Sequence, residues 1–192
     1  MTGLKKIKTA VFISGTGSNL RNIIKFSTIK KSPISIDLII SNTNKAKGLR
    51  FANQFKVKKK IFNFKNIENI ENIEKNILLL LKKEKIKFIC LAGFMKILSK
   101  GFIKKFEGKI INIHPSLLPK YKGLNTHSRA INNKDKFAGC TVHYVTAKLD
   151  SGKTILQKKI KIAARENPAS LAKKVLKQEH KLYLAAIMKI FN

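Results

Sequence analysis

Residues 11–24 read VFISGTGSNLRNII, and this stretch decides the fold class. It opens with the apolar run Val11-Phe12-Ile13, which is typical of a buried strand. A glycine-rich turn, residues 14–19, follows this run, and the apolar residues after the turn recur with helical spacing. A strand, a glycine turn and a helix in this order predict the first βα unit of an α/β fold.

The same alternation continues along the first half of the chain. Further strands are predicted at residues 36–40, 60–62 and 88–92, with helices between them at 47–54 and 67–85. Apolar strands that alternate with helices indicate a parallel sheet covered on both faces. We therefore expect an α/β, Rossmann-like fold with a mostly parallel, twisted sheet and helices on both faces.

The second half departs from this rhythm. A strand at 110–113 leads into a loop with two prolines at 114–123, and a short helix is predicted at 126–131. Two β-rich segments, 139–145 and 154–162, predict an antiparallel edge of the sheet, and a final helix runs from Pro168 to about Ile190. No linker rich in glycine, proline or serine separates the halves, so we expect a single domain over residues 1–192.

The composition favours a globular protein of the cytoplasm. The chain has 192 residues, of which 44% are hydrophobic. No apolar run reaches the roughly 18 residues of a membrane span, and residues 1–8 lack the apolar core of a signal peptide. Cys90 and Cys140 lie in apolar, strand-like stretches, so we expect packed thiols rather than a disulfide.

The net charge of +31 is compatible with two interpretations. Strong basicity can indicate nucleic-acid binding. However, nearly all of the 41 basic residues are lysines spread along the whole chain, and lysine, isoleucine and asparagine are residues with A/T-rich codons. A dedicated nucleic-acid binder usually includes arginine, whose planar fork binds phosphates and guanines. We therefore favour compositional drift, although the field would still attract small anionic substrates.

The glycine turn at residues 14–19 is the first candidate for chemistry. Its backbone N–H groups would lie at the positive end of a helix dipole, where a phosphate fits. The turn is not a Walker loop, because no Lys-Ser/Thr pair follows it, and Leu20 occupies the place of a third dinucleotide-site glycine. The alternative is a tight turn in which Ser18 caps the helix.

The second candidate is the pair Asn112 and His114, which would point to the same face of a strand. An amide and an imidazole at the carboxyl end of a strand could stabilise an oxyanion. The alternative is a capped loop in which His114 only binds a backbone carbonyl. Asp150 precedes Ser151-Gly152 and is an ordinary turn residue unless the fold brings it beside His114.

Other residues carry weaker signals. The four histidines and two cysteines have no metal-ligand spacing, so no metal is expected. Ser116 lacks the context of a hydrolase nucleophile. His127 and His143 could line a site or pack ordinarily, and for His143 we favour ordinary packing.

Together these segments resemble the phosphoribosylglycinamide formyltransferases, the folate-dependent glycinamide ribonucleotide transformylases of purine synthesis, within the formyltransferase superfamily. Five stretches carry the resemblance: residues 13–20, 91–98, 111–121, 139–150 and 178–180. The Asn-x-His-x-Ser-Leu-Leu-Pro stretch is common to the superfamily, whereas the glycine turn together with HPSLLPKY is more particular to this family. The matching segments span nearly the whole chain in the order of the family.

The resemblance implies direct transfer of a formyl group from the co-substrate 10-formyltetrahydrofolate to the amine of glycinamide ribonucleotide, without a metal. It also implies a phosphate-binding half at residues 1–100 and a catalytic, folate-binding half at 101–192. The catalytic residues would be Asn112, His114 and Asp150. The ribonucleotide-binding residues would be Gly17, Ser18, Asn19 and Glu179. The folate-binding residues would be Met95, Lys96, Ile97, Leu98, Thr146, Ala147, Lys148 and Leu149.

The chain departs from the family at a few positions. Lys96 stands where arginine is common, and a folate-side arginine expected near Ile70 is absent, so Lys65 or another lysine is expected to meet the glutamate tail of folate. Lys122 and Asn125 replace a common proline and histidine in the loop.

Three alternative functions differ from this one in domain content or in the residues they need. A formyltetrahydrofolate hydrolase would carry an extra N-terminal regulatory domain, whereas the first strand here is expected at about Ile7. A methionyl-tRNA formyltransferase would need a C-terminal tRNA-binding domain. A basic nucleic-acid-binding module on a decayed enzyme scaffold would not need Asn112, His114 and Asp150. We expect the partners to be small molecules rather than a membrane or a nucleic acid. The sequence predicts no oligomeric state.

Overall fold

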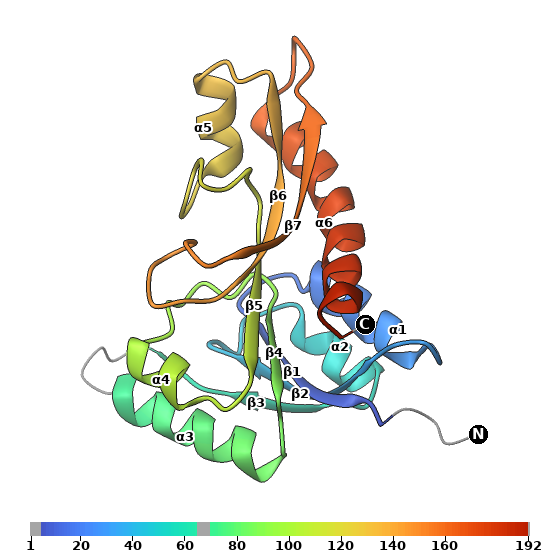
Figure 1. The fold of residues 1–192 in the computed structure, drawn as a ribbon, viewed down its shortest axis with the longest axis vertical. Helices are drawn as coiled ribbons and strands as arrows, with labels where there is room; N and C mark the ends of the chain where they lie inside the picture. Colours follow the sequence, from blue (N-terminus) through green and yellow to red (C-terminus); the bar gives the residue numbers. More distant parts are fainter. Residues whose placement is uncertain (1–4, 65–69, 192) are drawn as a thin grey trace. The chain divides into compact units, whose positions relative to one another are not determined.

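A computed structural model describes residues 5–64 and 70–191 of the chain (Figure 1). Lys65 and the first residues of the helix predicted at 67–85 lie outside the described residues. The chain divides into two compact units, residues 1–111 and 112–192, which are described separately below. The expectation of a single domain therefore stays a prediction.

The first unit contains the parallel sheet that the sequence predicts. Its strands are β1 (Ile7–Ile13), β2 (Ile34–Ser41), β3 (Lys58–Ile61) and β4 (Phe88–Leu91). β1 pairs in parallel with both β2 and β4, and β2 pairs in parallel with β3. Residues 10–13 of β1 and 88–90 of β4 are 0% exposed, which explains the unbroken hydrophobic runs of these strands.

Helices flank these strands. They are α1 (Ser18–Thr28), α2 (Leu49–Gln54), α3 (Ile70–Lys83) and α4 (Lys100–Lys105). α1 and α2 lie on one side of the strands, and α3 and α4 lie on the other (Figure 1). The sequence pattern missed α4, although the signal was present: Ser99 caps this helix by accepting a hydrogen bond from the Phe102 N–H at 3.0 Å.

The second unit is built around an antiparallel strand pair, as predicted. β5 (Lys109–His114) crosses from the first unit into the second, and the order of the sheet is β3-β2-β1-β4-β5-β6-β7. β6 (Phe137–Tyr144) pairs antiparallel with β7 (Thr154–Lys161). The fold is thus a seven-stranded, mostly parallel sheet with an antiparallel edge, which confirms the predicted fold class.

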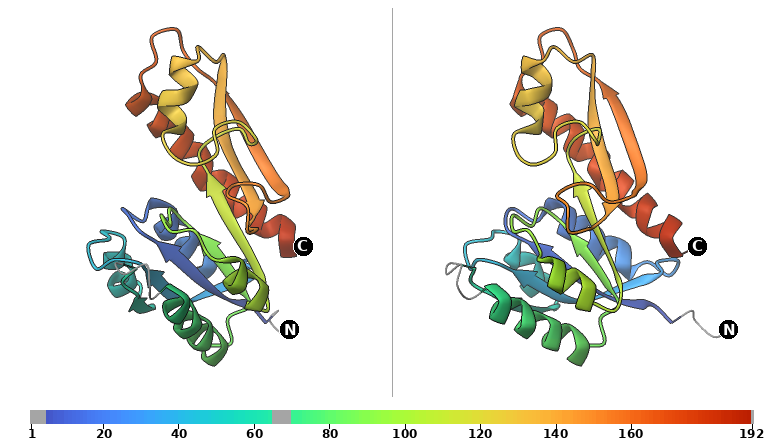
Figure 2. Two further views of the ribbon diagram at one scale, coloured as in Figure 1. Left: turned by 90° about the vertical axis from the view of Figure 1, so that its left-hand side faces the viewer. Right: turned by 60° about the vertical axis from the view of Figure 1, so that its left-hand side comes forward.

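Two helices complete the second unit: α5 (Thr126–Asn132) and the long α6 (Pro168–Phe191). α6 packs on β6, β7 and α5, and its start at Pro168 agrees with the prediction (Figure 2). It buries one side, including Leu171, Val175 and Tyr183, because its apolar residues recur with helical spacing.

Several local predictions need correction. Ser18 does not cap α1: the N-cap is Gly17, and no side chain caps this end. β3 begins at Lys58 rather than residue 60, because three consecutive exposed lysines hide a strand from any apolar pattern. Cys90 and Cys140 are buried free thiols, as expected. No helix among the described residues is long and apolar enough to cross a membrane.

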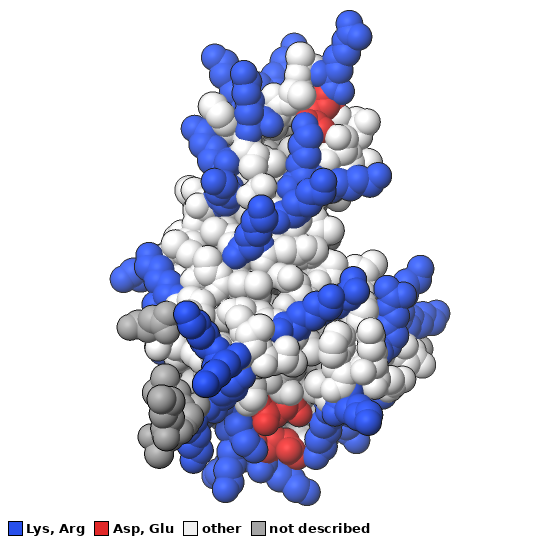
Figure 3. All heavy atoms as spheres, turned by 90° about the vertical axis from the view of Figure 1, so that its right-hand side faces the viewer, with Lys and Arg blue, Asp and Glu red and all other residues white. Residues whose placement is uncertain are grey.

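Lysine and arginine side chains cover the surface broadly. On the face drawn in Figure 3 they are scattered among uncharged atoms, with acidic groups in only a few places. Exposed ion pairs such as Lys87–Glu107, with an Nζ–Oε2 distance of 3.2 Å, contribute little to stability in water.

Candidate active site

β5 positions the amide and the imidazole. Asn112 and His114 are two residues apart on this strand, so their side chains lie on the same face. The strand ends at His114, which is only 6% exposed, and a proline-containing loop follows. Burial removes the imidazole from water and strengthens its electrostatic contacts.

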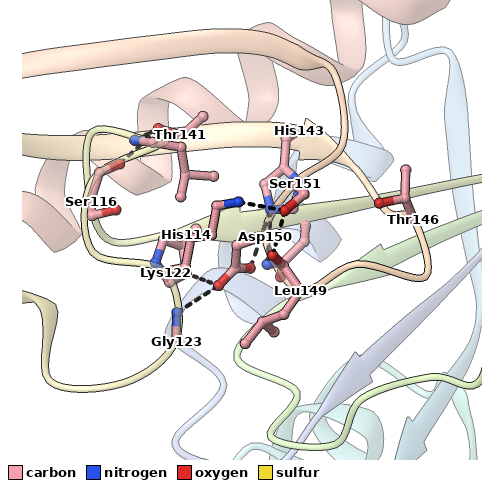
Figure 4. A network of polar contacts seen from close by, with 12 residues as sticks. His114, Ser116, Lys122, Gly123, Thr141, His143, Thr146, Leu149, Asp150 and Ser151 are labelled. Carbon is pink, nitrogen blue, oxygen red and sulfur yellow. Dashed lines mark hydrogen bonds and ion pairs between the residues drawn. The ribbon is translucent and has the colours of Figure 1, made fainter.

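Both ring nitrogens of His114 face acceptors (Figure 4). Nε2 lies 2.8 Å from the backbone carbonyl of Tyr121, and Nδ1 lies 3.3 Å from Oδ2 of Asp150. A carbonyl oxygen can only accept, so Nε2 carries a proton. His114 does bind a backbone carbonyl, as one of its two interpretations requires, and its part in stabilising an oxyanion stays a prediction.

Asp150 is not merely a turn residue, because the fold brings it beside His114. It lies in the loop between β6 and β7, in a left-handed conformation with φ 45°, and is 9% exposed. Oδ2 accepts a hydrogen bond from the Gly123 N–H at 2.9 Å, and Oδ1 lies 3.6 Å from Nε2 of His143. Although burial raises the pKa of Asp150, the contacts with His143, Gly123 and His114 outweigh it and lower this pKa.

The pKa of His114 lies below the usual value of histidine. Burial is the largest cause, and the charges of His143 and Arg129 add to it. The Tyr121 carbonyl and the Asp150 carboxylate act in the opposite direction and raise the pKa. The carboxylate therefore favours the imidazolium, but burial outweighs it.

His143 belongs to the cluster, so the preference for ordinary packing was wrong. It is 2% exposed, and its Nδ1 lies 2.9 Å from the Tyr144 carbonyl. Its Nε2 lies 3.3 Å from the amide nitrogen of Asn112, which can donate a hydrogen bond to it. The missed signal was the pair Thr141-x-His143 on β6, which repeats the alternation of Asn112-x-His114.

Thr141 and Gln157 hold the loop that follows His114. Thr141 Oγ1 donates to the Ser116 carbonyl at 2.7 Å and accepts from the Leu118 N–H at 3.2 Å. Gln157 Nε2 donates to Thr141 Oγ1 at 2.8 Å and to the Leu118 carbonyl at 3.0 Å. The peptide bond between Leu118 and Pro119 is cis. These contacts fix the loop whose Tyr121 carbonyl reaches His114.

Ser116 and His127 lie beside the cluster. Ser116 Oγ donates to the Lys120 carbonyl at 2.6 Å, which is a structural contact. His127 lines a pocket beneath the loop together with Pro115 and Tyr121. Burial and the charge of His114 lower its pKa. Among the described residues, no group of three or more His, Cys, Asp or Glu side chains could hold a metal ion.

The glycine turn lies in the first unit. Gly17 adopts a left-handed conformation with φ 75°, and a Cβ placed there would lie 2.6 Å from the Gly48 Cα. The Gly48 N–H also donates to the Gly15 carbonyl at 2.9 Å. Glycine is thus required at Gly17, and Ser18 and the buried Asn19 follow it in the first turn of α1, at the positive end of the helix dipole.

The remaining predicted residues lie in three places. In the first unit, Met95 and Ile97 are exposed, at 64% and 67%, and Leu98 is buried, at 3%. In the second unit, residues 146–149 form an exposed loop just before Asp150. Glu179 is buried on α6, and after the larger effect of burial its charge helps to raise the pKa of the Cys140 thiol to about 12.

Comparisons with known proteins support one family. The model of the formyl transferase family matches residues 7–187. The chain is 41% identical to phosphoribosylglycinamide formyltransferase of Haemophilus influenzae, over 92% of this chain and 83% of that protein. It is 40% identical to the human trifunctional purine biosynthetic protein adenosine-3 over 95% of this chain, but it spans only 18% of that relative's length.

Solved structures agree with the sequence relatives. The crystal structure of phosphoribosylglycinamide formyltransferase from Brucella melitensis superposes with a TM-score of 0.91 at 40% identity, covering 97% of this chain and 96% of that one. The corresponding structure from Coxiella burnetii gives a TM-score of 0.89 at 38% identity, over 95% and 86%. The chain therefore belongs to the formyl transferase family, in its phosphoribosylglycinamide formyltransferase branch.

Proposed function

We propose that the chain transfers the formyl group of 10-formyltetrahydrofolate to the amine of glycinamide ribonucleotide, giving formylglycinamide ribonucleotide and tetrahydrofolate in the synthesis of purines (IMP). The family and the names of the relatives support this assignment. The observation that carries it is the buried His114–Asp150 pair with Asn112 on the same strand. A bond forms between the amine nitrogen and the formyl carbon, the bond from that carbon to folate N10 breaks, and the amine proton passes to N10.

Asn112 is suited to stabilise the oxygen that gains charge as the amine attacks. Its amide group carries two hydrogens, and the contact to His143 uses one of them. The second hydrogen can be donated to the formyl oxygen. An amide does not titrate, so this donor is present at every physiological pH. Removal of one such donor typically costs about 10²–10³ in rate.

His114 is assigned as the second donor and as the group that assists proton transfer to N10. Its Nε2 donates to the Tyr121 carbonyl and its Nδ1 faces Asp150. To donate to the formyl oxygen, His114 must give up one of these two contacts. Giving up the hydrogen bond from Nε2 to the Tyr121 carbonyl leaves the contact between Nδ1 and Asp150 intact. The lowered pKa of His114 makes the imidazolium a stronger acid, which favours release of its proton.

Asp150 supports the charged form of His114 during this step. Its own pKa is lowered, so it is ionised at neutral pH and can neutralise the imidazolium. The Gly123 N–H donates to Oδ2, which orients the carboxylate, and Oδ1 lies 3.6 Å from Nε2 of His143. We assign His143 as a positioning residue, because its Nε2 contacts both Asn112 and Asp150.

The ribonucleotide is assigned to the glycine turn and α6. Gly17 is the N-cap of a helix of 11 residues that begins at Ser18 and Asn19, and the positive end of its dipole favours a phosphate. The net charge of +31 favours the approach of an anionic substrate. Glu179 is assigned to the same substrate, since a carboxylate accepts hydrogen bonds from the hydroxyl and amine groups of a ribonucleotide.

The folate is assigned to two exposed segments that carry apolar side chains. Met95, Lys96, Ile97 and Leu98 form the first, and Thr146, Ala147, Lys148 and Leu149 form the second. Met95, Ile97 and Leu149 are large apolar residues left 48–67% exposed, which is typical of surfaces that contact a ligand. The charge of Lys96 suits an anionic glutamate tail, though without the bidentate geometry of arginine.

The test is release of tetrahydrofolate from 10-formyltetrahydrofolate, followed by absorbance with and without glycinamide ribonucleotide. Release that depends on the ribonucleotide, together with formylated product detected by mass spectrometry, is the expected result. Release at the same rate without ribonucleotide would instead indicate a hydrolase. No turnover, combined with salt-sensitive RNA binding, would indicate a basic binding module.

A further inference from the structure

The segment Gly93–Ser99, which follows β4, holds three exposed residues between two anchors. Phe94 packs edge-on against Phe12 and Phe64, with ring centroids 5.4 and 6.1 Å apart, and Leu98 is buried. Between them lie Met95, Lys96 and Ile97, which are exposed. Packing at both ends of the segment thus leaves two apolar side chains and one lysine exposed to solvent between them.

Ser14, at the end of β1, fixes the beginning of this segment. Its backbone N–H donates to the Gly93 carbonyl at 3.1 Å. Its Oγ accepts a hydrogen bond from the Met95 N–H at 2.8 Å. The backbone and the side chain of Ser14 therefore bind the segment at Gly93 and at Met95. These two hydrogen bonds restrict the turn at Gly93, where φ is 73°.

Glu74, on α3, fixes the end of the segment. It is 4% exposed, and its carboxylate accepts hydrogen bonds from the Ser99 N–H at 2.8 Å and from the Ser99 hydroxyl. The same hydroxyl caps α4 by accepting from the Phe102 N–H. Burial of a carboxylate is costly unless hydrogen bonds compensate it. An apolar residue would fill this position of α3 without that cost, so the carboxylate has a specific use here.

We propose that Ser14 and Glu74 are positioning residues that set the affinity of the segment Gly93–Ser99 for the folate co-substrate. This inference rests on the proposed function, which assigns residues 95–98 to folate. Holding the exposed side chains in one arrangement before binding reduces the entropy lost on binding. The two residues act through Met95 and Ser99 and touch no reacting atom.

The principal test is the variant Glu74→Gln. Glutamine has the same shape and keeps one acceptor oxygen, but its amide nitrogen cannot accept from the Ser99 hydroxyl. We expect the KM for 10-formyltetrahydrofolate to rise about five-fold, the equivalent of one modest hydrogen bond. kcat and the KM for the ribonucleotide should stay within about two-fold, because neither depends on this segment in the proposal. Glu71→Gln, on the exposed side of α3, is the matched control and should change nothing.

Two measurements separate positioning from general destabilisation. Amide hydrogen exchange at Met95 and Ser99 should accelerate in Glu74→Gln, whereas exchange within β1 should not change. Ser14→Ala should raise the same folate KM and accelerate exchange at Met95. The double variant Glu74→Gln with Ser99→Ala should be no worse in folate KM than Ser99→Ala alone, because both changes remove one interaction.

Opposite results overturn the proposal. A folate KM that is unchanged in both Glu74→Gln and Ser14→Ala rejects the proposal. A fall in kcat together with a rise in the KM of both substrates also rejects it. Those results require a wild-type protein that transfers formyl to the ribonucleotide. A wild-type protein without ribonucleotide-dependent transfer rejects the proposed function instead, so the two failures are distinguishable.

Discussion

The two units of the molecule carry different kinds of functional groups. The first unit offers backbone N–H groups at Gly17 and exposed apolar side chains at Met95 and Ile97. The second offers titratable side chains, His114, His143 and Asp150, all less than 10% exposed. Backbone and apolar groups bind a ligand without changing their charge, whereas buried titratable groups can move protons. Under the proposed function, the chain would therefore build its binding determinants and its proton chemistry by different means.

The units also differ in how their groups are brought together. Gly17, Ser18 and Asn19 are consecutive, so a single turn fixes them. The cluster of the second unit draws on β5, β6 and the loop before β7, and only tertiary packing brings these segments together. The geometry of the glycine turn should therefore tolerate substitutions elsewhere in the chain. The geometry of the cluster in the second unit should depend on every contact that holds the loops around it.

His114→Ala should have the largest effect on the second unit. We expect kcat to fall at least about 10³-fold, because the variant loses an oxyanion donor and the proton donor together. Ribonucleotide binding, measured by calorimetry, should change little, since the glycine turn is in the first unit. Near-normal turnover would remove His114 from the mechanism.

Asp150→Asn should have the next largest effect and should act through His114. The carboxylate raises the pKa of His114 against burial, so its loss lowers that pKa further. The imidazolium fraction at neutral pH then decreases, and kcat should fall with it. The descending limb of the pH profile should move to lower pH. An NMR titration in which the pKa of His114 does not move would contradict the pairing.

Gly17→Ala tests whether the close approach of the glycine turn to Gly48 supports stability and ribonucleotide binding in the first unit. The added Cβ would lie 2.6 Å from the Gly48 Cα in a left-handed conformation. We expect a loss of about 1–3 kcal/mol in the free energy of unfolding and a higher KM for the ribonucleotide, with the pH profile unchanged. Gly15→Ala is the matched control for stability, because its Cβ meets no atom within 4 Å. Equal stability of the two variants would contradict the close approach of Gly17 and Gly48.

Acid should weaken the second unit more than the first, and this is the smallest expected effect. All four histidines lie in residues 112–192, and His114, His127 and His180 have pKa values lowered by burial. Since the unfolded chain then binds more protons, their contribution is complete above about pH 6.5 and is lost as the pH falls through the lowered pKa values. Hydrogen exchange, corrected for its intrinsic pH dependence, should accelerate in β6 and α6 before β1. Uniform acceleration would contradict this asymmetry.

The sequence by itself determined the parallel first half, because buried strands and amphipathic helices leave periodic apolar patterns that need no partner to be recognised. It also determined the glycine turn and the Asn112-x-His114 pair, since a turn and a strand face are local properties. It did not determine the three-lysine strand β3 or the short helix α4, whose stability comes from pairing and capping rather than from an apolar pattern.

Only the tertiary structure decided the roles of Asp150 and His143. Asp150 before Ser151-Gly152 is ordinary turn sequence, and His143 on a buried strand is ordinary core sequence. Their meaning depends on the approach of the β6–β7 loop to the end of β5, a contact between segments distant in the chain. Periodicity records which face of an element is buried, but it does not record which polar group that face meets. The pKa of His114 followed the same rule, since the depth of its burial, and not its carboxylate neighbour alone, set the direction.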